Sequence, residues 1–161
     1  QYLRDFTRRL GLAGYPAERD SGHLTRCRAD DSPLRTGRVL VAGDAAGLLE
    51  PWTREGISFA LRSGALAGET AAKAAVAGSP AAEEASLAEY PAAVSATLVP
   101  EMRAGRVMLS AFTRHAGSFH AGLATPKGWR VFVKMCRSEM SFSDLVSRPS
   151  ARLALAMLNR M

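Results

Sequence analysis

The chain has 161 residues, of which 47% are hydrophobic, so it can bury one core and is too short for two domains of ordinary size. Its two cysteines, Cys27 and Cys136, have no nearby partner cysteine, which argues against a disulfide framework or a zinc cage and fits the reducing cytoplasm. The formal net charge is +6, but the basic residues are scattered and form no stripe with interleaved aromatics, so no nucleic-acid partner is expected.

The first predicted element is a short amphipathic helix that ends at Gly11. Four apolar residues recur at helical spacing with Arg and Asp between them: Tyr2, Leu3, Phe6 and Leu10. We expect this helix to pack on the edge of a larger unit. The chain opens on it without an initiator Met or a secretory signal, so we expect upstream material to be missing and residues 1–37 to be the remnant of a substrate or sheet domain.

A loop region and one buried strand follow the first helix. Residues 15–37 combine Pro and Gly with many charges, which predicts a loop with one short strand at 23–28. Residues 38–42 read Arg-Val-Leu-Val-Ala and are closed by Gly43. A short apolar run rich in β-branched residues is typical of a buried strand in a parallel sheet.

Helix dominates the predicted structure after residue 55. An Ala-rich helix over 55–76 carries a small residue at every fourth position, which favours close approach to a neighbour: Ala60, Gly64, Gly68 and Ala72. Ser79 and Pro80, followed by the acidic Glu83 and Glu84, open a second helix that runs to about residue 115 with bends at its two prolines, Pro91 and Pro100.

The remaining helices are predicted over 126–138, 143–146 and 149–160, with Trp129 and Phe132 in the core of the first of them. Residues 38–80 form one unit with the strand, a loop and a long helix, and 81–161 form a C-terminal helical region. The longest uncharged run has 12 residues, whereas a membrane span takes about 20, so no transmembrane helix is predicted. The three histidines are not spaced as metal ligands, and no metal site is expected.

The segment around Gly43-Asp44 is the strongest candidate for a ligand site. Ligands of open α/β sheets bind at the carboxyl ends of strands, where the Asp44 carboxylate can accept hydrogen bonds from sugar or sugar-alcohol hydroxyls. The first amides of the following helix, at Gly56 and Ile57, carry partial positive charge that suits an anion. The alternative is that Asp44 only caps the next turn and the glycines only shape the loop.

This run resembles the second FAD-binding motif of flavoproteins related to p-hydroxybenzoate hydroxylase. Gly43-Asp-Ala-Ala-Gly, then Pro51, Thr53, Glu-Gly-Ile57 and Phe59-Ala-Leu-Arg-Ser-Gly64 are most similar to the geranylgeranyl reductase family. The resemblance implies an α/β FAD-binding fold, of which this chain is the C-terminal part, mostly helical with one or a few strands near residues 23–43.

The resemblance also implies roles for single residues and a reaction. Asp44, after the Gly43 turn, would contact the ribityl chain of FAD, Pro51 would shape the wall beside the flavin, and Gly56 and Ile57 would offer amides to its ring. Many relatives reduce double bonds in prenyl chains, with reduced nicotinamide or ferredoxin recharging the FAD. A cytoplasmic protein that contacts the membrane surface peripherally would fit such a lipid-like substrate.

Two departures from the family pattern stand out. Arg54 occupies a position where the family usually has Gly, and no G-x-G-x-x-G follows a strand to hold the FAD pyrophosphate. We therefore expect a fragment or truncated product whose partner is the missing N-terminal FAD-binding half. Trp52 is a candidate wall of the substrate cavity, and no catalytic acid or base can be named. The alternatives are an FAD-dependent monooxygenase or halogenase of the same superfamily, and a cofactor-free helical remnant that acts through protein contacts.

Overall fold

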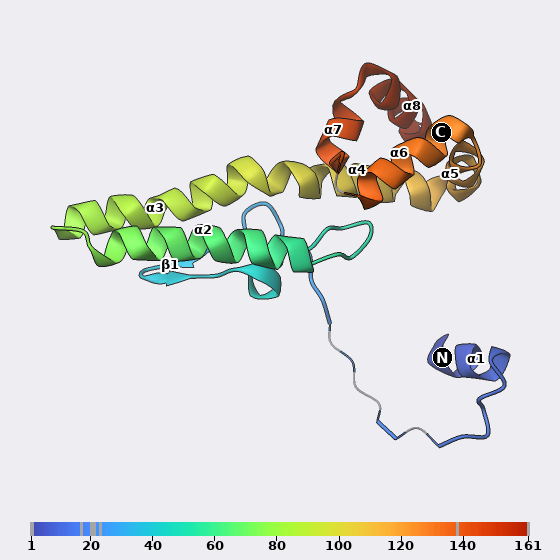
Figure 1. The fold of residues 1–161 in the computed structure, drawn as a ribbon, viewed down its shortest axis with the longest axis horizontal. Helices are drawn as coiled ribbons and strands as arrows, with labels where there is room; N and C mark the ends of the chain where they lie inside the picture. Colours follow the sequence, from blue (N-terminus) through green and yellow to red (C-terminus); the bar gives the residue numbers. More distant parts are fainter. Residues whose placement is uncertain (1, 17, 20–21, 23, 138, 161) are drawn as a thin grey trace.

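The computed structural model describes residues 2–16, 18–19, 22, 24–137 and 139–160, and most of them are helical (Figure 1). α2 (Ile57–Ala75) and α3 (Pro80–Thr97) lie side by side as an elongated pair, and α4 (Val99–Arg114) continues from α3. Four further helices gather around the end of α4: α5 (Ala116–Leu123), α6 (Pro126–Cys136), α7 (Phe142–Ser147) and α8 (Pro149–Arg160). Among the described residues, no helix is both long and apolar enough to cross a bilayer.

The predicted buried parallel strand is wrong. β1 (Arg35–Thr36) and β2 (Val39–Leu40) form a two-stranded antiparallel hairpin, and Val39 is 64% exposed. Gly37 has a φ of +56° in the two-residue loop, and a glycine at the first loop position is the pattern of a type II′ hairpin turn. This turn folds the chain back on itself at residues 37 and 38. The expected strand at 23–28 is absent over 24–28, and residue 23 lies outside the described residues.

Two helices begin at residues whose side chains cap them, and Ser79 was predicted to open its helix. Ser79 accepts a hydrogen bond from the Ala82 amide at the start of α3, and Thr125 accepts one from the Gly128 amide at the start of α6. A single break at Leu98 separates α3 from α4, while Pro91 lies inside α3. The helices predicted over 55–76, 126–138, 143–146 and 149–160 are confirmed with small shifts of their ends. The single bent helix predicted from Pro80 to about residue 115 is instead two helices, and α5 was not predicted.

Two hydrophobic clusters hold the helices together. The first joins the hairpin, α2, α3 and the start of α4, and its most buried members include Leu48, Tyr90, Val94 and Leu98. The second cluster joins α4 to α8 through Met108, Ala111 and Leu155, with Trp52 and two phenylalanines, Phe119 and Phe142, packed against it.

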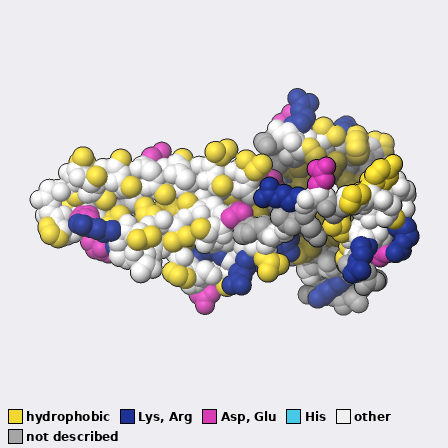
Figure 2. Space-filling model, turned by 90° about the horizontal axis from the view of Figure 1, so that it is seen from below, with side chains coloured by type: hydrophobic (Ala, Val, Ile, Leu, Met, Phe, Trp, Pro, Cys, Tyr) yellow, Lys and Arg dark blue, Asp and Glu magenta, His cyan; other side chains and the backbone are white. Residues whose placement is uncertain are grey.

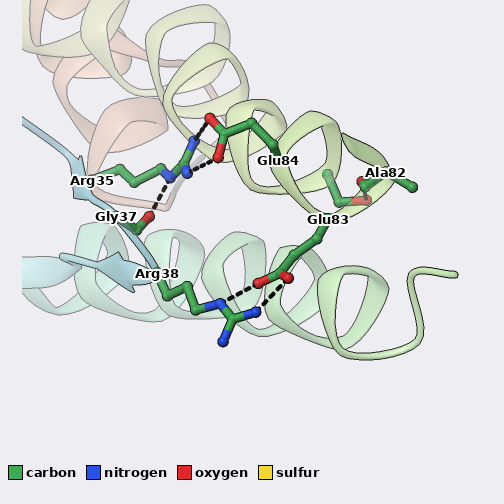
Figure 3. Close-up of polar contacts among 7 residues, drawn as sticks. Arg35, Gly37, Arg38, Ala82, Glu83 and Glu84 are labelled. Atoms are coloured by element: carbon green, nitrogen blue, oxygen red, sulfur yellow. Dashed lines mark hydrogen bonds and ion pairs between the residues drawn. The ribbon is translucent and has the colours of Figure 1, made fainter. Parts of the chain in front are cut away.

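Two ion pairs attach the hairpin to the start of α3 (Figure 3). Arg35 contacts Glu84 with both terminal nitrogens, at 2.8 and 2.5 Å, and Arg38 contacts Glu83 at 2.5 Å. Hydrogen bonding to these guanidinium groups lowers the pKa of both carboxyl groups. The two acids near the start of α3 therefore also fix the hairpin that leads into Gly43.

Three further expectations about packing are not met. α1 (Tyr2–Arg9) has no buried residue and lies apart from the other helices, with Tyr2 94% exposed (Figure 1). Trp129 is 56% exposed, so it is not core of its helix. Of the small residues on α2, Ala60 approaches the Gly43 turn closely, but a Cβ added to Gly64 or Gly68 would meet nothing within 4 Å among the described residues.

Surface side chains are unevenly distributed. In the view of Figure 2, hydrophobic side chains are spread along the elongated part of the molecule, and many of the basic ones gather at the right-hand end. The long face of the helix pair therefore carries few charges in this view.

Candidate functional site

An open cavity of about 580 Å³ lies where the Gly43 turn meets the start of α2. We call it the motif cavity, and its lining includes Gly43, Asp44, Leu49, Arg54, Gly56 and Ile57. Four of the five residues predicted to contact the cofactor therefore meet at one cavity. Pro51 is buried and is not part of the lining.

Gly43 is held in a conformation and a space that suit glycine alone. Its φ is +54°, and a Cβ atom there would lie 3.1 Å from the Cβ of Ala60. Its amide donates to the buried Ser63 hydroxyl over 3.0 Å, and that hydroxyl donates to the Phe59 carbonyl over 2.7 Å. The turn is thus bonded to the interior of α2.

The strand end that precedes Gly43 is fixed by Tyr90 of α3. The Tyr90 hydroxyl donates to the Val41 carbonyl over 2.7 Å, and its side chain is fully buried. Burial raises the pKa of this phenol, which keeps its proton available for donation. Tyr90 positions the chain before Gly43, and this role was not predicted from the sequence.

Asp44 lies in a short 3₁₀ turn, Gly43–Ala46, that Gly47 closes. Gly47 has a φ of +64°, and a Cβ there would lie 2.7 Å from the Arg28 nitrogen, so glycine is required. The Arg28 amide donates to the Gly47 carbonyl over 2.8 Å. This close contact lays residues 26–28 against the turn.

The Asp44 side chain is exposed and has no hydrogen-bond partner among the residues that the structure describes. The turn has no side-chain cap, so the alternative role of this carboxylate as a capping group is not seen. A Cβ on Gly56 would lie 3.2 Å from the Asp44 Oδ1 atom and 2.7 Å from the Leu49 Cδ1 atom. Gly56 therefore lets the start of α2 lie directly beside the carboxylate.

The first amides of α2 form the other polar wall of the motif cavity. Glu55 accepts hydrogen bonds from the Ser58 amide and hydroxyl, both at 2.8 Å, and so satisfies one of the first amides. Within the described part of the chain, no acceptor is seen for the amides of Gly56 and Ile57. Arg54 adds a positive charge to the same wall.

The loop 50–56 is folded around Glu50. This side chain is 3% exposed, and its Oε2 atom accepts hydrogen bonds from the Thr53 amide and, at 2.6 Å, from the Thr53 hydroxyl. The Glu50 amide donates to the Glu55 carbonyl over 2.8 Å. Arg54 adopts a φ of +64°, the left-handed region that favours glycine. A glycine at this position would suit that backbone, and the arginine does not.

Pro51 and Trp52 point away from the motif cavity. A Cβ on Gly105 of α4 would lie 2.9 Å from the Pro51 Cδ atom, so the proline packs against α4. Its predicted place beside a flavin stays a prediction. Trp52 packs against three phenylalanine rings at centroid distances of 5.6 to 5.8 Å: Phe112, Phe119 and Phe142.

Trp52 also lines two further cavities. The C-terminal cavity, of about 400 Å³, includes Trp52, Met108, Phe119, Val131, Met135 and Leu155 in its lining. The loop cavity, of about 740 Å³, includes Glu50, Trp52, Thr53, Glu101, Phe132 and Phe142. Met108 belongs to the second hydrophobic cluster and Phe119 packs against it, and both also line the C-terminal cavity.

The motif cavity matches part of a flavin in the chemistry of its walls. A free carboxylate suits hydroxyl groups, and free helix-start amides suit a carbonyl-bearing ring. Nothing in the described lining corresponds to a glycine-rich loop for a pyrophosphate. The residues present therefore fit the ring and the sugar-alcohol chain of FAD, and not its adenine half.

Curated relatives match a limited part of the chain. Over 81 residues it is 38% identical to digeranylgeranylglycerophospholipid reductase 3 of Methanosphaera stadtmanae, covering 46% of this chain and 19% of that protein. Over 69 residues it is 36% identical to an uncharacterized protein of Methanosarcina barkeri, covering 43% of this chain and 18% of that protein. The chain thus spans about a fifth of the length of these relatives. No family model matches the chain. No solved structure matches it. The resemblance to a reductase is supported by a partial homologue that carries that name.

Proposed function

We propose that this chain supplies the flavin-ring and ribityl contacts of an FAD-dependent oxidoreductase that reduces double bonds in prenyl chains. The observation that carries the proposal is the convergence of Gly43, Asp44, Gly56 and Ile57 on one cavity. The name of the Methanosphaera relative, a reductase of a digeranylgeranyl lipid, supports the choice of substrate class.

Each wall of the motif cavity has a distinct role in this proposal. The Asp44 carboxylate accepts hydrogen bonds from the ribityl hydroxyls, and the Gly56 and Ile57 amides donate to the ring. The positive helix start and Arg54 favour negative charge on the ring. FAD, when bound, supplies the hydride, with reduced nicotinamide or ferredoxin as the source of electrons. The protein residues orient the ring. No residue is assigned as the proton donor.

The rest of the cofactor site belongs, in this proposal, to a longer protein. The adenine half of FAD needs a glycine-rich loop at a helix start, and the described residues offer none beside the motif cavity. The N-terminal half of an FAD-binding domain is therefore the proposed partner of this chain. We also propose a location at the membrane surface, because the proposed substrate carries prenyl chains and is lipid-like.

Riboflavin is the sharpest probe of this proposal, because it carries the ring and the ribityl chain without the pyrophosphate. Purified chain is titrated into riboflavin while flavin fluorescence is followed. We expect saturable binding that Asp44→Ala weakens about tenfold or more, since a hydrogen bond to a charged group contributes about 1.5–3 kcal/mol.

Asp31→Ala is the matched control for the Asp44 variant. Asp31 is an exposed carboxylate outside the motif cavity, so its loss should leave riboflavin affinity unchanged. A chain that shows no saturable fluorescence change behaves as the cofactor-free remnant. Equal affinity of the wild type and the Asp44 variant would also contradict the proposal.

A further inference from the structure

The C-terminal cavity is a built apolar pocket that the flavin proposal does not use. Helices α4 to α8 and Trp52 line it, it opens to the surface, and its walls are almost entirely carbon. Its volume of about 400 Å³ lies within the range of roughly 300–1,000 Å³ that is common for ligand pockets. Two methionines, Met108 and Met135, contribute flexible side chains that adapt to irregular apolar ligands.

The few polar groups of this cavity are already used or exposed. The Thr125 hydroxyl accepts from the Gly128 amide at 3.0 Å and donates to the Gly122 carbonyl at 2.7 Å. Lys127 is the single charged residue in the described lining, and because it is exposed it lies at the opening. A polar ligand would find few partners inside, whereas an apolar chain with an anionic head would match both the wall and the opening.

The cavity also continues toward the loop that carries the flavin motif. Trp52, Phe132 and Met135 line both the C-terminal cavity and the loop cavity. The loop cavity extends to Glu50 and Glu55, and Arg54 and Gly56 of the same loop line the motif cavity. A chain that enters at Lys127 and passes Trp52 would therefore enter the loop cavity, on the other side of the loop 50–56 from the motif cavity.

We infer that the C-terminal cavity binds the apolar chain of an isoprenoid with an anionic head group, with the head beside Lys127 and the chain directed past Trp52. The choice of an isoprenoid over a straight acyl chain rests on the proposed function. The cavity walls by themselves indicate a ligand with an apolar chain and a negatively charged head beside Lys127.

The test titrates geranylgeranyl diphosphate into the full chain and follows tryptophan fluorescence. Trp129→Phe serves as the background, because it leaves Trp52, which lines the cavity, as the reporter. We expect a saturable change in emission. Lys127→Gln should weaken binding of the diphosphate several-fold in low salt and leave binding of geranylgeraniol unchanged, since a surface charge is screened by salt.

Two glycines of α5 provide matched variants that fill or spare the cavity. Gly122 lines the cavity and Gly117 does not, and a Cβ at either position meets nothing within 4 Å. Gly122→Leu should weaken geranylgeranyl diphosphate binding about tenfold or more, because added methylenes compete with the ligand for the pocket. Gly117→Leu makes the same change on the exposed face and should bind as the background protein does. Circular dichroism of both variants checks that α5 remains folded.

Three results would overturn the inference. They are the absence of saturable binding, equal affinities of the Gly122→Leu and Gly117→Leu variants, and palmitate binding as tight as that of the isoprenoid. The riboflavin titration reports on Asp44, which does not line this cavity. Loss of riboflavin binding with retained isoprenoid binding would therefore refute the flavin proposal alone, and the opposite pattern would refute only the lipid site.

Discussion

Replacing Arg54 by glycine should stabilise the chain. Arg54 is the one non-glycine residue in the described parts of the chain with a positive φ, at 64°. Left-handed backbone costs an L-residue about 1–2 kcal/mol, while glycine brings an entropic cost of about 0.5–1 kcal/mol. The Arg54 guanidinium donates to the Cys27 sulfur at 3.3 Å, but this contact is exposed and contributes little. The balance predicts a gain of about 0.5–1 kcal/mol for Arg54→Gly.

The control for this prediction is Arg54→Ala, which removes the guanidinium and keeps the Cβ that causes the strain. Urea denaturation followed by far-UV circular dichroism measures both variants. A gain of 1 kcal/mol corresponds to a rise in melting temperature of roughly 2–4 °C for a chain of this size. If the glycine variant is no more stable than the alanine variant, position 54 stores no backbone strain and the account of this loop is wrong.

Two further predictions concern the supports of the site. Gly105→Ala should destabilise the chain by about 1–3 kcal/mol, because its Cβ would overlap the buried Glu50 carboxylate. Gly117→Ala, in open space on α5, should instead add about 0.5–1 kcal/mol, and equal effects in urea denaturation would contradict the packing described. The hydrogen-bonded Arg35 guanidinium lowers the pKa of Glu84, so the stability from this pair is present above the unfolded pKa of about 4.3 and is lost as pH falls through the lowered folded value. Thermal melts from neutral to acid pH should show this loss in low salt and less of it in high salt, and an Arg35→Gln variant with the same acid profile would refute the pairing.

Local signals carried most of what the sequence predicted about the fold. Ser79 and Thr125 are residue types that favour a helix start, because their side-chain oxygen can accept a hydrogen bond from an early amide of the helix. Both side chains accept such a bond in the structure. α5 was missed because His115 precedes it and forms no side-chain cap. The hairpin turn had a readable signal in Gly37, but the apolar run 38–42 was interpreted as a central strand. Only Val39 and Leu40 pair, and their partner strand is too short to show a pattern.

The motif residues were predictable and their supports were not. Gly43, Asp44, Gly56 and Ile57 lie within 15 residues of one another, so a local pattern could group them. The groups that fix the turn come from afar. Ser63 acts across 20 residues, and Tyr90 reaches Val41 across 49. A serine within an Ala-rich helix and a tyrosine in the next helix carry no sequence mark of such contacts, because only tertiary packing brings them to the turn.

The loop 50–56 is the element that the two proposals share. Its Arg54 and Gly56 face the motif cavity, while Glu50, Trp52 and Thr53 face the loop cavity, so the loop is the wall between the two. The hydrogen bonds from Thr53 to Glu50 hold the loop against itself, and Pro51 rests on α4. The proposed reductase would have to bring a bound flavin and an apolar chain together while keeping water out. A short, internally bonded wall between a polar cavity and an apolar one meets that requirement, because the two ligands can meet at its edge without sharing a binding surface.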